Sequence, residues 1–296
     1  MDIGNIATAM ITPFSEDGSV HFEMLSDVIE HLIANGTDSL VVSGTTGESP
    51  TLSYDEKVAI FQYTVDVVNN RVPVIAGTGS NNTQASIGLT KAAEAVGVDG
   101  IMLVAPYYNK PSQRGMYEHF AAIANSTALP VMLYNIPGRS VVNIETQTIV
   151  QLSNIPNIEV IKEASGSLDQ ITEIIARTPN DFQVYSGDDG LTLPLLSIGG
   201  NGVVSVAAHI VGNDMQKMIK AFKEGRHAEA ATIHQALLPL IRALFATPSP
   251  STLKYALTKI GIGTEYVRLP IALLTDLEKV AYDDAWQEYL EKQKQF

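Results

Sequence analysis

A unit made of a short apolar run, a turn and a segment of helical period repeats along most of this chain, and this repeat constrains the fold more than any other feature. Runs such as IMLVA (101–105) and PVMLY (130–134) are continuously apolar, as expected for strands covered on both faces. The runs interpreted as strands span residues 6–11, 39–43, 72–77, 100–105, 131–135, 159–162, 182–186 and 202–207. Eight units within about 225 residues predict an α/β fold, a (β/α)8 TIM barrel over residues 1–224.

Helical segments follow these runs. They are predicted at residues 22–34, 55–68, 83–96, 115–125, 144–152, 168–177, 191–197 and 214–223. Residues that favour helix N-caps precede three of them: Ser53 or Asp55, Asn143 and Asn213. A doubly wound open sheet is the alternative architecture, but no G-x-G-x-x-G follows the first strand to support it.

The pattern changes at Gly225. Residues 226–244, 251–260 and 275–292 have helical periodicity with no apolar strand between them, and prolines separate them. We predict a C-terminal helical extension over residues 225–296 that adds to the outside of the barrel and contributes to assembly.

Composition excludes several classes of protein. The net charge is −13 and no basic run occurs, which argues against binding to nucleic acid. The chain has no cysteine, and its six histidines are scattered, so no metal site is predicted. No Lys or Arg precedes Lys57, and no apolar run approaches the roughly 18 residues that span a bilayer. We therefore expect a cytoplasmic protein with no membrane segment.

Reactive side chains follow the predicted strands. The segments after the strands are T12-P13, G44-T-T-G-E48, G77-T-G-S80, P106-Y-Y-N109, Y134-N-I-P-G-R139, K162-E-A-S165, S186-G-D-D189 and S205-V-A-A208. In a barrel enzyme the active site lies at the carboxyl ends of the strands. Hydroxylic, aromatic and charged groups would therefore gather on one rim.

Lys162 ends an apolar strand in I-E-V-I-K-E-A-S-G (158–166). One interpretation is a rim lysine that pairs with an acid such as Glu163. The other is a Schiff-base lysine, because partial desolvation lowers the pKa of an amine and frees its lone pair for attack on a carbonyl. The sequence pattern by itself does not distinguish these two interpretations of Lys162.

Other rim residues have two interpretations each. The glycines and threonines of residues 44–48 form either a plain connection or a seat for a small anion. Tyr134 and the pair Tyr107–Tyr108 are either hydrogen-bonding rim residues or proton-transfer groups. Arg139 is either a solvated loop residue or a clamp for a carboxylate.

Two further sets of charged residues are predicted to have no role in catalysis or binding. Lys254 lies in the helical segment S-T-L-K-Y-A-L-T-K and is predicted to be a surface residue. Asp188 and Asp189 are predicted to cap the helix that follows them rather than to bind a cation.

Together these segments resemble the dihydrodipicolinate synthase family over nearly the whole chain. The segments that carry the resemblance are G-T-T-G-E-S (44–49), V-I-A-G-T-G (74–79), P-Y-Y-N-K-P-S-Q-R-G (106–115), L-Y-N-I-P-G-R (133–139), I-K-E-A-S-G (161–166), S-G-D-D (186–189) and G-V-V-S-V (202–206). G-x-x-G-E and Y-N-x-P alone indicate only the wider family, which includes N-acetylneuraminate lyase and keto-deoxy sugar acid aldolases.

The resemblance implies a role for each catalytic residue. Lys162 would form a Schiff base with pyruvate, and Tyr134 would move protons around the imine and the aldehyde. Thr45 would link Tyr134 by hydrogen bonds to Tyr108, which would reach in from a neighbouring subunit.

It also implies the residues that bind the substrates. Thr46, with the backbone of Thr45, would receive the pyruvate carboxylate. Arg139 would bind the carboxylate of L-aspartate 4-semialdehyde, and Gly187 and Val204 would line the pyruvate pocket.

The implied reaction is the condensation of the two substrates to 4-hydroxy-tetrahydrodipicolinate, in lysine and diaminopimelate biosynthesis. It would need no cofactor besides the lysine–pyruvate imine. A homotetramer, built as a dimer of dimers, is the implied assembly. The alternatives are a related pyruvate-dependent aldolase or lyase, and a keto-acid-binding barrel without catalysis.

Two departures from the family pattern are present. Members inhibited by lysine tend to carry His, His and Glu where this chain has Tyr54, Lys57 and Ala85. An added cation and a lost carboxylate predict weak or absent inhibition by lysine. The pattern Asn-Pro-x-Pro-x-Lys before the late helix is here S-P-S-T-L-K (249–254).

Overall fold

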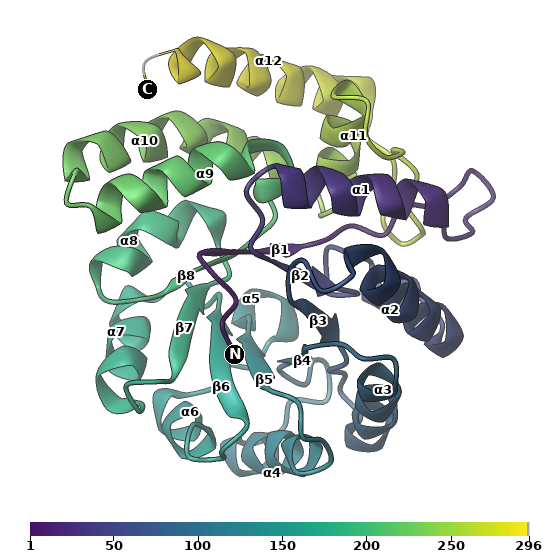
Figure 1. The fold of residues 1–296 in the computed structure, drawn as a ribbon, viewed down its shortest axis with the longest axis vertical. Coiled ribbons are helices and arrows are strands. Elements are labelled where there is room, and N and C mark those ends of the chain that lie inside the picture. Colours follow the sequence, from purple (N-terminus) through teal and green to yellow (C-terminus); the bar gives the residue numbers. More distant parts are fainter. Residues whose placement is uncertain (295) are drawn as a thin grey trace.

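The computed structural model of the chain describes residues 1–294 and 296. Its eight parallel strands close into a barrel in chain order, because β8 pairs with β1 as well as with β7 (Figure 1). The strands are β1 (Ile6–Ala9), β2 (Ser39–Val42), β3 (Val74–Gly77), β4 (Gly100–Val104), β5 (Val131–Asn135), β6 (Ile158–Glu163), β7 (Gln183–Ser186) and β8 (Gly202–Ser205). The predicted (β/α)8 barrel is confirmed, and the open sheet is excluded.

Helices surround the barrel and shield its strands from solvent. They are α1 (Phe22–Ala34), α2 (Tyr54–Val68), α3 (Thr83–Ala95), α4 (Gln113–Ala124), α6 (Thr146–Leu152), α7 (Leu168–Arg177), α8 (Thr192–Ser197) and α9 (Ala208–Lys223). One-turn elements lie in three loops: η1 (Ser49–Thr51), α5 (Pro137–Ser140) and η2 (Asp189–Leu191).

Side chains from every second strand position fill the barrel, because successive residues of a strand point to opposite faces. The buried cluster inside includes Val41, Ile75, Met102, Met132, Tyr134, Val160, Tyr185 and Val204. The alternate residues pack against the helices. Both faces of the strands are thus covered, which explains their continuously apolar sequences.

Helix starts differ from prediction where tertiary contacts take the expected capping side chain. Ser53 caps α2 in a capping box with Glu56, as predicted. Asn143 does not cap α6; its amide donates to Gln170 Oε1 at 2.8 Å. α9 begins before Asn213 and is kinked at Val211, so the segment predicted from 214 is its second part.

The C-terminal extension contains α10 (His227–Leu244), α11 (Ser251–Lys259) and α12 (Asp276–Gln293). Gly225, with a φ of +79°, reverses the chain between α9 and α10, which pack together. In Figure 1, α10 and α12 lie on the side of the barrel formed by α9 and α1. In the described part of the chain, no helix is long and apolar enough to cross a membrane.

Candidate active site

Lys162 and Tyr134 lie side by side on neighbouring strands. They are register partners in the β5–β6 ladder, and Lys162 Nζ lies 4.1 Å from the centre of the Tyr134 ring. Both are buried, with 5% and 4% of their surface exposed. A lysine ammonium in this position is attracted to the face of the aromatic ring.

Glu163 does not pair with Lys162, so that interpretation of the lysine is wrong. Adjacent strand residues face opposite sides, and the Glu163 carboxylate accepts hydrogen bonds outside the barrel from Asn135 at 3.0 Å and Gln170 at 3.2 Å. Lys162 makes no salt bridge to any described residue. Its ammonium is therefore buried without a directly bound carboxylate.

Burial lowers the pKa of Lys162 to about 8. The charge of Arg139 lowers it further, whereas the buried carboxylate of Asp189 raises it. Since a lysine in water has a pKa near 10.4, the neutral amine is far more abundant here at neutral pH. The site therefore favours attack of Nζ on a carbonyl.

Burial has the opposite effect on Tyr134 because its charged form is the phenolate. It raises the pKa of Tyr134 to about 12, against the influence of Arg139 and a polar contact with Thr45. The phenol is thus protonated at neutral pH and can donate to an oxygen that forms next to Lys162.

The turn of residues 44–48 lies at the end of β2. Its threonines differ in exposure: Thr45 is half-buried and Thr46 is 4% exposed. Ser43, directly before the turn, and Glu48, its last residue, have φ of +53° and +54°, values that non-glycine residues rarely adopt. The backbone folds back tightly, with Glu48 N–H donating to Thr45 O at 3.0 Å.

A cavity of about 270 Å³ opens at this mouth of the barrel. It is lined by Ser43, Gly44, Thr45, Ser49, Pro50, Lys57, Gly77, Gly79, Ser80, Met102, Val104, Tyr107, Tyr134, Ile136, Arg139 and Ser140. Two cations, Lys57 and Arg139, and no carboxylate belong to this set, so the cavity suits an anionic ligand. Lys162 is not in this set but contacts Tyr134, which is.

Gly187 gives the Lys162 side chain its room. A Cβ at position 187 would lie 3.0 Å from Lys162 Cε and 2.8 Å from Ala164 Cβ, closer than the space allows. Val204 on β8 is 1% exposed and belongs to the buried layer that also contains Tyr134. Gly187 therefore borders the Lys162 side chain, and Val204 belongs to the same buried layer as Tyr134.

Tyr108 stands apart from this group. It is 87% exposed and holds a φ of +72°. A positive φ is rare for a bulky residue other than glycine. Arg139, in α5, is also exposed, but it borders the cavity.

Lys254 is not a surface residue, which corrects the prediction. Its side chain is fully buried, and its Nζ donates to Glu48 Oε1 at 2.6 Å. Burial lowers the pKa of Lys254 to about 8, as for Lys162, so the ion pair and not the pKa separates the two lysines. A sequence signal existed: Leu253 and Leu257 put this stretch of α11 on a buried face.

Asp188 and Asp189 are both predicted to cap the helix that follows them, and the structure confirms this for Asp188 but not for Asp189. Asp188 accepts from Gly190 N–H at 2.8 Å and caps η2. Asp189 is 2% exposed and instead accepts from Val206 N–H at 3.1 Å and from Ser205. It thereby fixes the loop between β8 and α9. Among the described residues, no group of three His, Cys, Asp or Glu could hold a metal ion.

Comparison with known proteins assigns the family. Residues 2–288 match the model of the dihydrodipicolinate synthetase family. The chain belongs to this family. The 4-hydroxy-tetrahydrodipicolinate synthase of Bacillus velezensis is 61% identical over 97% of this chain and 100% of that protein.

Solved structures of the family agree with the fold. A dihydrodipicolinate synthase from Bacillus anthracis has a TM-score of 0.96 and 56% identity, and the match covers 97% of this chain and 98% of that one. A family member from Cyanidioschyzon merolae with lysine bound has a TM-score of 0.95 and 43% identity, with coverage of 97% and 98%. The predicted family membership is confirmed.

Proposed function

We propose that this chain is an enzyme that condenses pyruvate with L-aspartate 4-semialdehyde to 4-hydroxy-tetrahydrodipicolinate, a step of lysine and diaminopimelate biosynthesis. The observation that carries the proposal is Lys162, a buried lysine with a lowered pKa and no bound carboxylate, next to the Tyr134 phenol. The 61% identity to a 4-hydroxy-tetrahydrodipicolinate synthase supports the choice of substrates. We expect it to act in the cytoplasm.

The reaction starts at Lys162. Its neutral amine attacks the keto carbon of pyruvate and forms a carbinolamine. Tyr134 donates a proton to the carbinolamine hydroxyl, which leaves as water when the C=N bond forms. The C=N group forms as a protonated iminium, and transfer of one of its methyl protons to a base gives the neutral, nucleophilic enamine, so the lysine itself provides the electron sink and no further cofactor is required.

The pyruvate carboxylate binds the turn of residues 44–48 in this proposal. The Thr46 side chain and the Thr45 backbone N–H donate to it, as backbone N–H groups of tight turns do to anions. Gly187 and Val204 bound the pocket around the keto group. This arrangement directs the carbonyl carbon toward Lys162.

The second substrate enters from the cavity. Arg139 binds its carboxylate, and the enamine carbon attacks the aldehyde while Tyr134 protonates the new alkoxide. The amine of the adduct then attacks the imine carbon, the ring closes, and Lys162 leaves as the free amine.

Tyr108 completes the site of a neighbouring subunit and exchanges protons with Tyr134 through Thr45. Its exposure and its positive φ support this role, because one chain gives the side chain no enclosed environment. The assembly we propose is a tetramer made of two dimers. Sedimentation analysis of the unaltered chain and of a Tyr108→Ala variant measures the assembly. Activity in a mixture of the Tyr108→Ala and Lys162→Ala variants tests whether Tyr108 is shared between subunits.

Reductive trapping tests the function. The protein is incubated with pyruvate, reduced with borohydride and digested, and the modified peptide is found by mass spectrometry. We expect the adduct on Lys162 and its loss in Lys162→Ala. No adduct would exclude catalysis through a Schiff base. Turnover with N-acetylmannosamine but not with aspartate semialdehyde would instead indicate a lyase.

A further inference from the structure

The turn of residues 44–48 is tied to the C-terminal extension by a buried ion pair. The Glu48 carboxylate accepts from Lys254 Nζ at 2.6 Å and from the backbone N–H of Arg268 at 2.9 Å. Lys254 and Glu48 both have side chains that are almost completely buried. Lys254 Nζ also donates to Tyr266 O at 2.7 Å. Both oxygens of Glu48 are therefore held by the extension.

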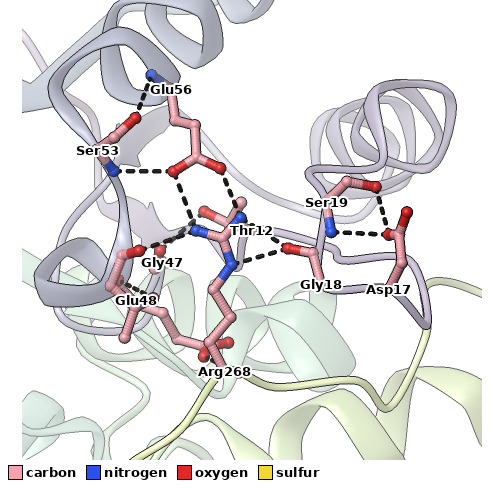
Figure 2. A network of polar contacts seen from close by, with 10 residues as sticks. Thr12, Asp17, Gly18, Ser19, Gly47, Glu48, Ser53, Glu56 and Arg268 are labelled. Carbon is pink, nitrogen blue, oxygen red and sulfur yellow. Dashed lines mark hydrogen bonds and ion pairs between the residues drawn. The ribbon is translucent and has the colours of Figure 1, made fainter.

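Arg268 extends the connection to the first two loops of the barrel (Figure 2). Its guanidinium donates to Gly18 O at 2.7 Å, to Thr51 O at 2.8 Å and to the Glu56 carboxylate at 2.5 Å and 3.0 Å. Glu56 closes the capping box of α2 with Ser53, and Figure 2 shows this box next to the guanidinium. One arginine of the extension thus joins the loop after β1 to the start of α2.

Both cations lie over the aromatic ring of Phe14. Lys254 Nζ is 4.2 Å and the Arg268 guanidinium carbon 4.3 Å from its centre. Phe14 O accepts from the Thr264 hydroxyl at 2.7 Å. Two cation–π contacts and one hydrogen bond therefore fix α11 and the loop after it to the barrel next to the turn.

The backbone of the turn transmits this restraint to the threonines. Glu48 is the last residue of the turn and has a left-handed backbone, which persists only where its surroundings hold it. Thr12 Oγ1 donates to Gly47 O at 2.8 Å from the barrel side. Thr45 and Thr46 thus lie directly before Gly47, which is held by Thr12, and Glu48, which is held by Lys254.

We propose that Lys254 is a positioning residue for the carboxylate seat formed by Thr45 and Thr46, and that it acts through Glu48. The proposal rests on the proposed function, since it assumes that this turn receives pyruvate. Lys254 itself does not touch the substrate. Without it, Glu48 loses the cation that holds its Oε1 atom, the left-handed turn relaxes and the backbone donors no longer meet at one point.

Substitution of Lys254 tests the proposal, with Lys259→Met as the matched control on the same helix. Lys259 pairs with Asp283 on the surface and does not contact the turn. We expect Lys254→Met to raise the KM for pyruvate about tenfold while the kcat changes less than threefold, because a displaced anchor weakens binding more than chemistry. Equal KM values for the two folded variants would overturn the proposal.

A double variant covers the case in which Lys254→Met does not fold. Glu48→Gln combined with Lys254→Met removes both buried charges, so neither remains unpaired. We expect this variant to fold, as measured by circular dichroism, and still to show the raised KM for pyruvate. A folded double variant with the KM of the unaltered protein contradicts the role of Lys254.

Hydrogen exchange of the unaltered protein gives a test without substitutions. Coupling between two sites is reciprocal, so pyruvate bound at the turn should slow exchange of the Arg268 amide, which donates to Glu48. Slower exchange at residues 44–48 with no change at Arg268 would overturn the proposal. Borohydride trapping on the same samples separates the two hypotheses: no adduct on Lys162 refutes the function, whereas an adduct with uncoupled exchange refutes only the positioning role.

Discussion

The Nζ atom of Lys162 lies 4.1 Å from the centre of the Tyr134 ring, and burial shifts the two groups in opposite directions. The pKa of Lys162 falls to about 8, and that of Tyr134 rises to about 12. One apolar environment therefore yields a neutral nucleophile and a protonated donor at the same pH, which is the pair that imine formation requires.

The rate of imine formation should depend on the pKa of Lys162. Below about pH 8 the fraction of Lys162 that is neutral, and with it the initial rate, should increase about tenfold per pH unit. Above about pH 8 the rate should level off. Trapping of pyruvate with cyanoborohydride at a series of pH values measures this. Lys162→Arg should give no adduct at any pH. A rate that still rises above pH 10 would show that the site does not lower the pKa.

Tyr134→Phe should lower kcat about a hundredfold, because it removes the proton donor and keeps the ring beneath Lys162. Tyr185→Phe is the control: Tyr185 is another buried tyrosine of the barrel, and its hydroxyl donates to Gly4 O at 2.7 Å, away from the cavity. Steady-state kinetics of both variants check the prediction. Equal loss of kcat in the two variants would indicate a packing effect.

Arg139→Ala should raise the KM for aspartate semialdehyde about a hundredfold and leave the adduct with pyruvate intact. The pKa of Lys162 should rise, because the charge of Arg139 helps to lower it. Arg114→Ala alters an arginine with 88% side-chain exposure and serves as the control. Loss of the pyruvate adduct in Arg139→Ala would assign Arg139 to the first substrate instead.

Lysine should inhibit this protein weakly or not at all. Lys57 places a basic side chain at the edge of the cavity, although burial lowers its pKa, and Tyr54 and Ala85 provide no carboxylate. Activity measured against lysine concentration checks this, and strong inhibition at submillimolar lysine would contradict it. Lys57→His combined with Ala85→Glu should increase the inhibition, because it removes a cation and adds an anion.

Glu56 should stabilise the fold only above acidic pH. Its contacts with Arg268 hold the pKa of the Glu56 carboxyl at about 2, below the usual value of 4.5. A lowered pKa adds stability above pH 4.5 that is lost as the pH falls toward 2. Glu56→Gln should therefore lower the free energy of unfolding by about 1 kcal/mol at pH 7, a value kept small by partial exposure, and by less at pH 3.

Urea unfolding at both pH values measures this effect. Glu291→Gln is the control, since Glu291 is exposed and forms no ion pair with a described residue. A Glu56→Gln effect of the same size at both pH values would mean that the carboxylate charge does not contribute.

The elements of the fold were predictable because their signals are local. Apolar runs and helical periodicity placed the strands and helices, and the strand predicted at 131–135 coincides with β5. The prediction failed where long-range contacts determine the local structure. Asn143 bonds Gln170 rather than the start of α6, and α9 begins at Ala208 although its capping signal comes later.

Much of the candidate site was also predictable, because a barrel brings the ends of distant strands to one rim. Thr45, Tyr134 and Arg139 meet around one cavity, as their positions after the strands indicated. The prediction that Lys254 lies on the surface was wrong because its partner, Glu48, lies 206 residues away and no periodicity encodes that contact.

By itself, the sequence determined the number and order of the strands and which reactive residues end them, since both depend on neighbouring residues and on the alternation of strand faces. Only the tertiary structure decided which lysine is free to react. Lys162 and Lys254 both lose solvent and both have a pKa of about 8, but only Lys254 finds a carboxylate within 2.6 Å. That difference depends on where the distant segment with Glu48 packs. In a buried site a lysine with a carboxylate partner forms an ion pair, whereas a lysine without one can react as an amine.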